Sequence, residues 1–317
     1  MFVERWSGHD ARTALAGPDL DRWLGVARGV AAVVVELGDD PGADIAEALT
    51  RLPLVAIGHG SAPDAAWDVT TIDPEPVLAG VAAAPNAAVV TAQTLRLTDR
   101  LTIAAGLTVE SLAYATLQAG PEFRAWLDGR GRRVRRDEGP RVTITDDGGS
   151  ATITLDRPHL RNLLDARMRD ELVDALRVLA LVPDRPIRIV GVGPAFCAGG
   201  DPAEFGTVSD AATAHLIRSS ANVAPWLVAV ADRTTVHVHG PCVGAGVELA
   251  AFCHRVTASA DARFRLPETR MGLMPGAGGT VSVPRRIGRQ RTLEWLLVDR
   301  EIDAPTARRW GLVDELT

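Results

Sequence analysis

The chain has 317 residues, 46% of them hydrophobic and 23% charged, a balance that is ordinary for a globular protein and excludes wholesale disorder. Its formal charge of −6 provides no broad attraction to nucleic acid, and none of its apolar runs reaches the roughly 18 residues that a membrane-spanning helix needs. All 34 basic residues are arginine, so chemistry that needs a lysine, such as a Schiff base or a Walker-type phosphate loop, is excluded.

The length and the opening residues set expectations for organisation and location. A chain of 317 residues can bury a sizeable core, and we expect two parts rather than one. The first residues, MFVERWSGHD, lack the basic-then-apolar order of a secretory signal. A cytoplasmic protein with no membrane partner is therefore expected.

The first half reads as alternating strands and helices followed by helices alone. GVAAVVVELG at residues 29–38 and PLVAIGHG at residues 53–60 predict strands, and IAEALTRL at residues 45–52 predicts a helix between them. Residues 74–130 are helical in pattern, with apolar docking faces in the run TVESLAYATLQAGPEFRAWLDGR. The strand and helix order resembles a shortened copy of the second half, which suggests a degenerate internal duplication.

An arginine-rich stretch, RGRRVRRDEGP, separates the two patterned halves. A solvated linker is favoured over a phosphate-binding role for it. The expected organisation is an N-terminal region over residues 1–130, a linker over residues 131–139 and a catalytic domain over residues 140–317.

The second half opens with a β-α-β unit. ATITLDRP, from residue 151, is an apolar and β-branched run closed by a turn-forming Arg-Pro, and IRIVGVG lacks polar alternation, as parallel strands covered on both faces do. Between them, three- and four-residue steps predict a helix. The apolar positions of that helix are Leu164, Met168, Leu172, Ala175, Leu176 and Leu179.

Two glycine-containing loops follow the next strands. PAFCAGGDPAEFG comes after IRIVGVG, and PCVGAG comes between the strand TTVHVHG and the helical run VELAAFC. Turns of this type leave backbone N–H groups free at a helix start, where negative charge is favoured. If the two strands lie side by side, the amides near Gly200 and Ala245 converge.

Histidine and cysteine offer little support for a metal. His237 and His239 share one face of a strand, which makes zinc conceivable, but no third ligand is convincing, and packing or hydrogen bonding is favoured. The three cysteines show neither paired metal spacing nor a disulfide framework, so buried free thiols are expected.

Two acids, Glu248 and Glu268, stand in an otherwise small and apolar stretch. Carboxylates are costly to bury unless they are paired or hydrogen-bonded, so they serve either as solvated or capping groups or as a working pair.

Residues 150–317 resemble the crotonase superfamily, the group of enoyl-CoA hydratases and isomerases. Four motifs carry the resemblance in the family's order: ATITLDRPHLRNLLDARMRDEL, PAFCAGGD, GPCVGAGVELAAFC and FRLPETRMGLMPGAGGT. The resemblance implies an α/β fold with a crotonase-like ββα-superhelix spiral core, and the N-terminal half would then be a shortened crotonase-like repeat plus a helical segment.

The resemblance also implies site residues. The backbone N–H groups of Gly200 and Ala245 match the family's oxyanion hole, where glycine is common at the second position but only the N–H is needed. Glu248 and Glu268 match its catalytic glutamates. The residues implied to lie against the substrate are Ala198, Asp201 and Gly276, the last near the reactive water.

The activity implied is hydration of a 2,3-unsaturated acyl-CoA, because water at C3 and a proton at C2 suit two carboxylates. Isomerisation and other CoA-thioester chemistry are the alternatives, and a non-catalytic acyl-CoA-binding or assembly subunit is an alternative of another class. The resemblance implies no metal and no cofactor beyond the coenzyme A of the substrate. It also implies a homo-oligomer, a trimer or hexamer.

One segment is out of its usual order. Family members close with helices after the position of GLVDELT, and residues 94–130 resemble that closing segment although they precede the catalytic half. We expect this run to cover the catalytic half, from its own chain or from a neighbour's.

Overall fold

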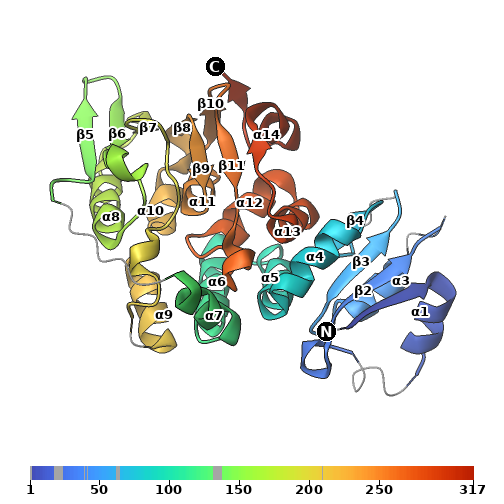
Figure 1. Cartoon of the computed structure of the whole chain (residues 1–317). Coiled ribbons are helices and arrows are strands. Elements are labelled where there is room, and N and C mark those ends of the chain that lie inside the picture. The colour runs from blue at the N-terminus through green and yellow to red at the C-terminus, as the bar shows by residue number, and fades with distance from the viewer. Residues whose placement is uncertain are drawn as a thin grey trace.

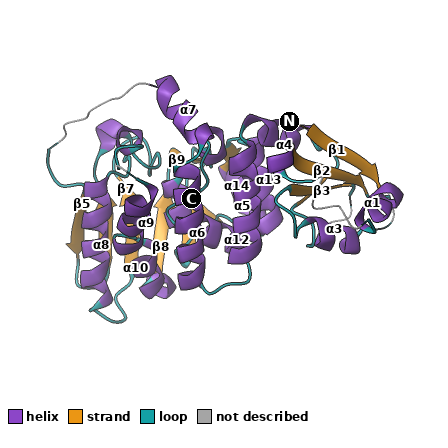
Figure 2. Cartoon of the chain, turned by 90° about the horizontal axis from the view of Figure 1, so that it is seen from below, coloured by secondary structure: helices purple, strands orange, loops and turns teal. Residues whose placement is uncertain are grey.

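The computed structural model describes residues 2–17, 24–38, 40, 42–61, 65–130, 138–208 and 210–317. Figures 1 and 2 show the N-terminal sheet at one end of the molecule and a larger, helix-covered sheet at the other. Helices from the middle of the first half stand between the two sheets. The linker predicted at residues 131–139 falls mostly outside the described residues.

The N-terminal sheet is parallel throughout, with the strand order β1-β2-β3-β4. Its elements are β1 (Phe2–Ser7), α1 (Gly8–Leu15), β2 (Val30–Glu36), α3 (Ala43–Leu49), β3 (Val55–His59) and β4 (Val69–Thr71). The two strands and the helix predicted here are confirmed, and the first six residues of β2 are buried, as its unbroken apolar run requires. That this sheet is a shortened copy of the second half stays a prediction.

Four helices follow and confirm the helical reading of residues 74–130: α4 (Glu75–Ala83), α5 (Pro85–Thr98), α6 (Ile103–Gln118) and α7 (Pro121–Arg130). Helix α4 crosses helix α13 (Arg289–Val298) so closely that a Cβ on Gly80 would lie 2.0 Å from the carbonyl oxygen of Leu297. No single described helix is long and apolar enough to cross a membrane; α4 and α5 pass that test only as a pair, bent by 111°.

The larger sheet has the order β13-β10-β8-β7-β6-β5, parallel except for the antiparallel edge strand β5. Its strands are β5 (Val142–Asp146), β6 (Ala151–Leu155), β7 (Ile187–Gly191), β8 (Thr234–Val238), β10 (Arg255–Ala258) and β13 (Glu315–Leu316). Strands β7 and β8 pair directly, so the loops that follow them leave the same edge of the sheet.

A small sheet and six helices complete this part. The sheet comprises β9 (Pro241–Val243), β11 (Arg263–Arg265) and β12 (Ile302–Asp303). The helices are α8 (Ala166–Ala180), α9 (Ala211–Ser220), α10 (Ala224–Ala229), α11 (Ala245–Ala250), α12 (Gly279–Ile287) and α14 (Ala304–Trp310), besides α13. Helix α8 begins later than predicted, because Asp165 caps it by accepting the Met168 N–H at 2.8 Å, and Leu164 therefore lies before the helix.

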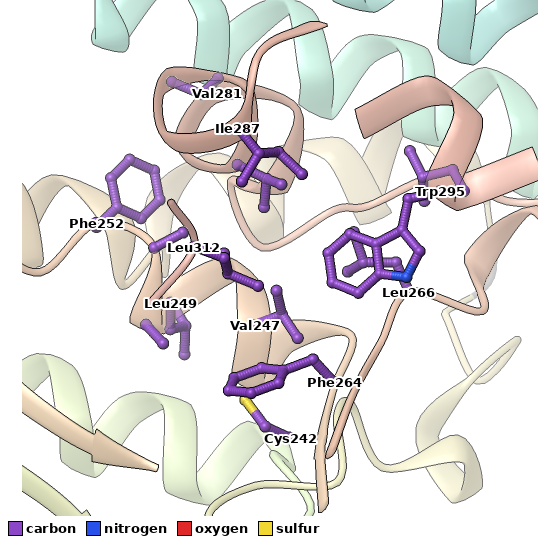
Figure 3. Close-up of a cluster of buried hydrophobic side chains, with 14 of the residues drawn as sticks. Cys242, Val247, Leu249, Phe252, Phe264, Leu266, Val281, Ile287, Trp295 and Leu312 are labelled. Atoms are coloured by element: carbon purple, nitrogen blue, oxygen red, sulfur yellow. The ribbon is translucent and has the colours of Figure 1, made fainter. Parts of the chain in front are cut away.

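The main core is shared between the two halves of the chain. It joins side chains of the larger sheet and of α11, α12 and α13 to apolar side chains of α4, α5 and α6. Figure 3 shows the part of this core around α11, with Val247, Leu249, Phe264 and Trp295 among its buried side chains. A second cluster lies between the N-terminal sheet and helices α1 and α3. Helices α4, α5 and α6 are thus part of the core of the second half.

Candidate active site

A cavity of about 370 Å³ opens where the loops after β7 and β9 meet helices α6 and α9. All the residues that the resemblance implied for a site line this cavity. They are Ala198, Gly200, Asp201, Ala245, Glu248, Glu268 and Gly276. Tyr114 and Gln118 of α6 and Arg218 of α9 line it too, so the cavity is walled by both halves of the chain.

The two loops run side by side in parallel register. Cys197 and Cys242 form a parallel bridge, and the Val243 N–H donates to the Cys197 carbonyl at 2.9 Å. Gly200 and Ala245 each lie three residues beyond the bridged cysteines. Their N–H groups donate to no hydrogen-bond acceptor among the described residues. Two unpaired amides at equivalent positions of paired loops can serve one shared acceptor.

Gly244 allows the second loop to approach an acid. Its φ of 49° and ψ of −119° lie in a region that L side chains rarely adopt, and an added Cβ would lie 2.5 Å from the Oε1 of Glu268. The carboxyl group of Glu268 therefore packs against Gly244, the residue that precedes the Ala245 N–H.

Glu248 is held in place by the segment before α12. Its side chain projects from α11, it is 2% exposed, and its Oε2 accepts the N–H groups of Ala277 at 2.7 Å and Gly279 at 2.8 Å. Burial raises its pKa well above 4.5, and the neighbouring Glu268 and Glu110 raise it further. Because one oxygen is committed to two amides, the orientation of the carboxylate is fixed.

Glu268 is buried but incompletely hydrogen-bonded. It opens a short 3₁₀ turn (Glu268–Met271) after Pro267 and is 7% exposed. Its Oε2 is buried and has no hydrogen-bond partner among the described residues. Burial raises its pKa to about 8. An acid that lines a cavity, keeps its proton near neutral pH and has one oxygen unpaired is suited to exchanging a proton with a ligand.

Glu110 of α6 is a third buried acid at the site, and the sequence reasoning missed it. Its Oε1 accepts the Gly278 N–H at 2.7 Å, and its Oε2 accepts the Thr280 N–H at 2.8 Å and the Thr280 hydroxyl at 2.7 Å. Four successive amides, from residue 277 to residue 280, thus alternate between Glu248 and Glu110. Burial raises the pKa of Glu110 to about 7. The only feature of the sequence that could have pointed to Glu110 is its position as an acid in the apolar run ESLAYATL.

The remaining predicted residues have structural partners. Asp201 lines the cavity, but its Oδ2 accepts from Arg157 at 2.8 Å and its Oδ1 accepts the Ala203 N–H at 3.0 Å, so its carboxylate is used within the protein. Gly276 lies against Tyr114, whose ring would be 2.4 Å from an added Cβ. Only a glycine leaves room there for the tyrosine.

The residues weighed for a metal are engaged in hydrogen bonds. His237 Nδ1 lies 3.0 Å from the Thr257 hydroxyl, and His239 Nε2 lies 2.9 Å from the Gly193 carbonyl oxygen. Among the residues that the structure describes, no group of three or more His, Cys, Asp or Glu side chains could hold a metal ion. The three cysteines are buried free thiols, as expected.

The buried acids should make stability depend on pH. The pKa of Glu268 is about 8 in the folded chain against 4.5 in an exposed glutamate, so the folded state keeps a proton that the unfolded chain has lost. This stabilisation is complete below about pH 4.5 and is lost as the pH rises through about 8. The free energy of unfolding should therefore fall over that range, and Glu268→Gln should reduce the fall by on the order of 3 kcal/mol.

Urea unfolding at about pH 5, 7 and 9 measures this slope. Glu47→Gln, at an exposed position of α3, is the control and should leave the slope as in the wild type. An identical slope in the wild type and Glu268→Gln would contradict the raised pKa.

Comparison with known proteins gives one consistent result. A family model for enoyl-CoA hydratase/isomerase matches residues 145–317. The enoyl-CoA isomerase/hydratase fer4 of Mycosarcoma maydis is 31% identical over 174 residues, which are 52% of this chain and 64% of that protein. The matched part of the chain thus spans about two thirds of the length of several of its curated relatives, and less of others.

Solved structures agree. An enoyl-CoA hydratase subunit from Geobacillus kaustophilus is 32% identical with a TM-score of 0.52, covering 57% of this chain and 70% of that one. A Thermobifida fusca protein solved with acetoacetyl-CoA is 30% identical with a TM-score of 0.50, covering 56% of this chain and 73% of that one.

Proposed function

The chain belongs to the enoyl-CoA hydratase/isomerase family of the crotonase superfamily, and we propose that it adds water across the 2,3 double bond of an acyl-CoA thioester. The observation that carries this proposal is the pair of buried acids on one cavity, Glu248 fixed by two amides and Glu268 with an oxygen unpaired. The acyl-CoA bound to the Thermobifida fusca relative supports the substrate class.

The thioester oxygen is bound by the N–H groups of Gly200 and Ala245. As the nucleophile adds to C3, negative charge moves to this oxygen, and two fixed donors stabilise that charge without reorganisation. The unpaired state of both amides and the parallel register of their loops support this role. Ala198 and Gly276 line the space beside the thioester, and Asp201 holds the first loop through Arg157.

The two acids divide the proton transfers. Water beside Glu248 gives its oxygen to C3 and one proton to the ionised Glu248, whose charged form is favoured by the N–H groups of Ala277 and Gly279, while Glu268 gives its own proton to C2. One hydroxyl group and one hydrogen are added, and the acid pair keeps one proton overall. The raised pKa of Glu268 supports its role as the donor, because a carboxyl group with a pKa of about 8 is still protonated at neutral pH.

A direct absorbance assay tests the proposed hydration. Wild-type protein should bleach the conjugated-enoyl absorbance of crotonyl-CoA or a longer homologue, with formation of the 3-hydroxyacyl-CoA. Ala245→Pro replaces the N–H by a ring carbon, at the first position of a helix where proline is tolerated, and should lower kcat/KM by at least about 10²–10³-fold.

Ala245→Gly retains the N–H and is the matched control, expected to keep far more activity than Ala245→Pro. Failure of the wild type to hydrate any chain length would reject the proposal. Movement of the double bond without water addition would instead establish the isomerase alternative, which draws on the same cavity. Binding without turnover would favour the non-catalytic subunit.

The family likeness also supports assembly into a trimer or hexamer. We propose the acyl-CoA thioester as the small-molecule partner, with no cofactor beyond its coenzyme A. Helices α6 and α9 leave Leu112 and Leu216 more than half exposed, at 51% and 65%, on the surface near the cavity. Light scattering in solution measures the number of protomers, and a monomer would contradict this part of the proposal.

A further inference from the structure

The end of the cavity formed by α6 and α9 carries a cation that the proposed hydration does not use. Arg218 of α9 lines the cavity together with Tyr114 and Gln118 of α6. The ring of Tyr114 lies between Arg218 and the part of the cavity at Gly276. This ring packs against Gly276, and the Arg218 Cζ lies 4.2 Å from the ring centroid. The cation is therefore within reach of a short acyl chain.

The guanidinium is held by neutral groups. Its Nη1 donates to the carbonyl and hydroxyl oxygens of Ser111 at 3.2 and 3.3 Å, and its Nη2 donates to the Gln118 Oε1 at 2.7 Å. Within the described part of the chain, no carboxylate forms an ion pair with Arg218. Stacking on Tyr114 and three hydrogen bonds fix the group without a direct ion pair.

A cation that lines a cavity, is held in one orientation and has no direct ion-pair partner among the described residues favours an anionic ligand. An arginine has five N–H donors, and the contacts to Ser111 and Gln118 leave donors unused. Charges taken out of water are normally paired, and the planar fork of a guanidinium matches a carboxylate better than any other group on an acyl chain. Burial lowers the pKa of Arg218, while the nearby Tyr114, Glu110 and Glu248 raise it without forming a direct ion pair, so the protein compensates this cation only in part.

The second arginine on the cavity differs in this respect. Arg169 of α8 forms an ion pair with Asp170 at 2.7 Å. Arg169 thus has a direct ion pair within the protein, whereas the hydrogen-bond partners of Arg218 are neutral. The contrast supplies a matched control for an experiment.

We propose that Arg218 binds a carboxylate at the far end of the acyl chain, so that the preferred substrates are enoyl-CoA thioesters of short dicarboxylic acids. This inference rests on the proposed function and specifies its substrate class. Gln118 orients the guanidinium, and the Tyr114 ring forms the wall along which the chain passes from the thioester to the cation.

Three thioesters test the proposal: crotonyl-CoA, glutaconyl-CoA, which differs from it by a terminal carboxylate, and 2-hexenoyl-CoA, which has an uncharged chain of similar length. The readout is the ratio of kcat/KM for glutaconyl-CoA to that for 2-hexenoyl-CoA. In the wild type this ratio should be about tenfold or more, because an unpaired polar site rejects an apolar chain. Arg218→Gln should reduce the ratio to about one or below, and Arg218→Lys should give an intermediate value.

Arg169→Gln should leave the ratio as in the wild type. The proposal is overturned if the wild type prefers the uncharged chain or if the preference survives Arg218→Gln. It is also overturned if Arg218→Gln slows all three thioesters equally, since Arg218 would then only offset the buried acids. Circular dichroism of each variant establishes that it is folded.

Binding separates this proposal from the proposed function. If the wild type turned over none of the thioesters, calorimetry with glutaryl-CoA and hexanoyl-CoA would still report on the cation. Tighter binding of glutaryl-CoA that is lost in Arg218→Gln would uphold the carboxylate site in a protein that is not a hydratase. Equal binding of the two would reject the site.

Discussion

Glu268→Gln should lower kcat for hydration by about 10²–10⁴-fold, the usual contribution of a positioned general acid. The amide keeps the size and shape of the carboxyl group against Gly244 but has no proton to give to C2. Binding of a saturated acyl-CoA, measured by calorimetry, should change far less than kcat. Turnover of Glu268→Gln within tenfold of the wild type would remove Glu268 from the mechanism.

The pH profile provides a second measurement of the same role. Because Glu268 must be protonated to act, and its pKa is raised to about 8, kcat/KM should fall as the pH rises through that value. Glu248 and Glu110 titrate together with it, so the profile reports the acid cluster rather than one residue. Glu204→Gln is the control and should leave the alkaline limb of the profile unchanged. Glu204 lines the same cavity, but both of its carboxylate oxygens accept the Ala166 N–H.

Glu110→Ala should lower both stability and activity although Glu110 belongs to the other half of the chain. The change leaves the Gly278 N–H, the Thr280 N–H and the Thr280 hydroxyl without their acceptor. Each buried donor left unpaired costs about 1–3 kcal/mol, so the free energy of unfolding should fall by at least about 3 kcal/mol. We expect kcat to fall by roughly tenfold or more, because the same amide segment orients Glu248.

A positioning role and a merely structural role differ in the pH profile. Without the negative charge of Glu110 nearby, the pKa of Glu268 should drop, and the alkaline limb of the profile should move to lower pH. Glu110→Gln also removes the charge and should move the alkaline limb as far as Glu110→Ala does, but it retains one acceptor oxygen and should lose less stability. Glu122→Ala is the matched control: Glu122 accepts two backbone N–H groups at the start of α5, so its loss should cost stability without moving the alkaline limb.

Local patterns in the sequence predicted the elements that form the site. Apolar runs gave strands β2, β3, β6 and β7, and glycine-containing turns gave the two loops whose amides stand unpaired at Gly200 and Ala245. These signals suffice because a strand or a turn depends on neighbouring residues. The start of α8 was misplaced by two residues at Leu164, because the capping side chain of Asp165 overrides the apolar period.

Glu110, Tyr114 and Arg218 could not be assigned to the site from sequence. Each meets the catalytic segments through contacts between residues far apart in the chain, such as the Glu110 hydrogen bonds to residues 168 and 170 positions away. A buried acid in an apolar helix and an exposed one look alike until the fold places them. The sequence left open whether residues 94–130 cover their own chain or a neighbouring one. In the structure they cover their own chain: α6 lies against α9 and α12, and α7 lies against the turn at Glu268.

The alternation of four amides between Glu248 and Glu110 has a consequence for how the protein becomes active. The segment from Ala277 to Thr280 has one acid from each half, so its geometry is complete only after the early helices have docked onto the late ones. A chain in which the two halves have not docked lacks one acid of this frame, so the amides of the segment lose half of their acceptors. Turnover therefore reports directly on whether the two halves have come together.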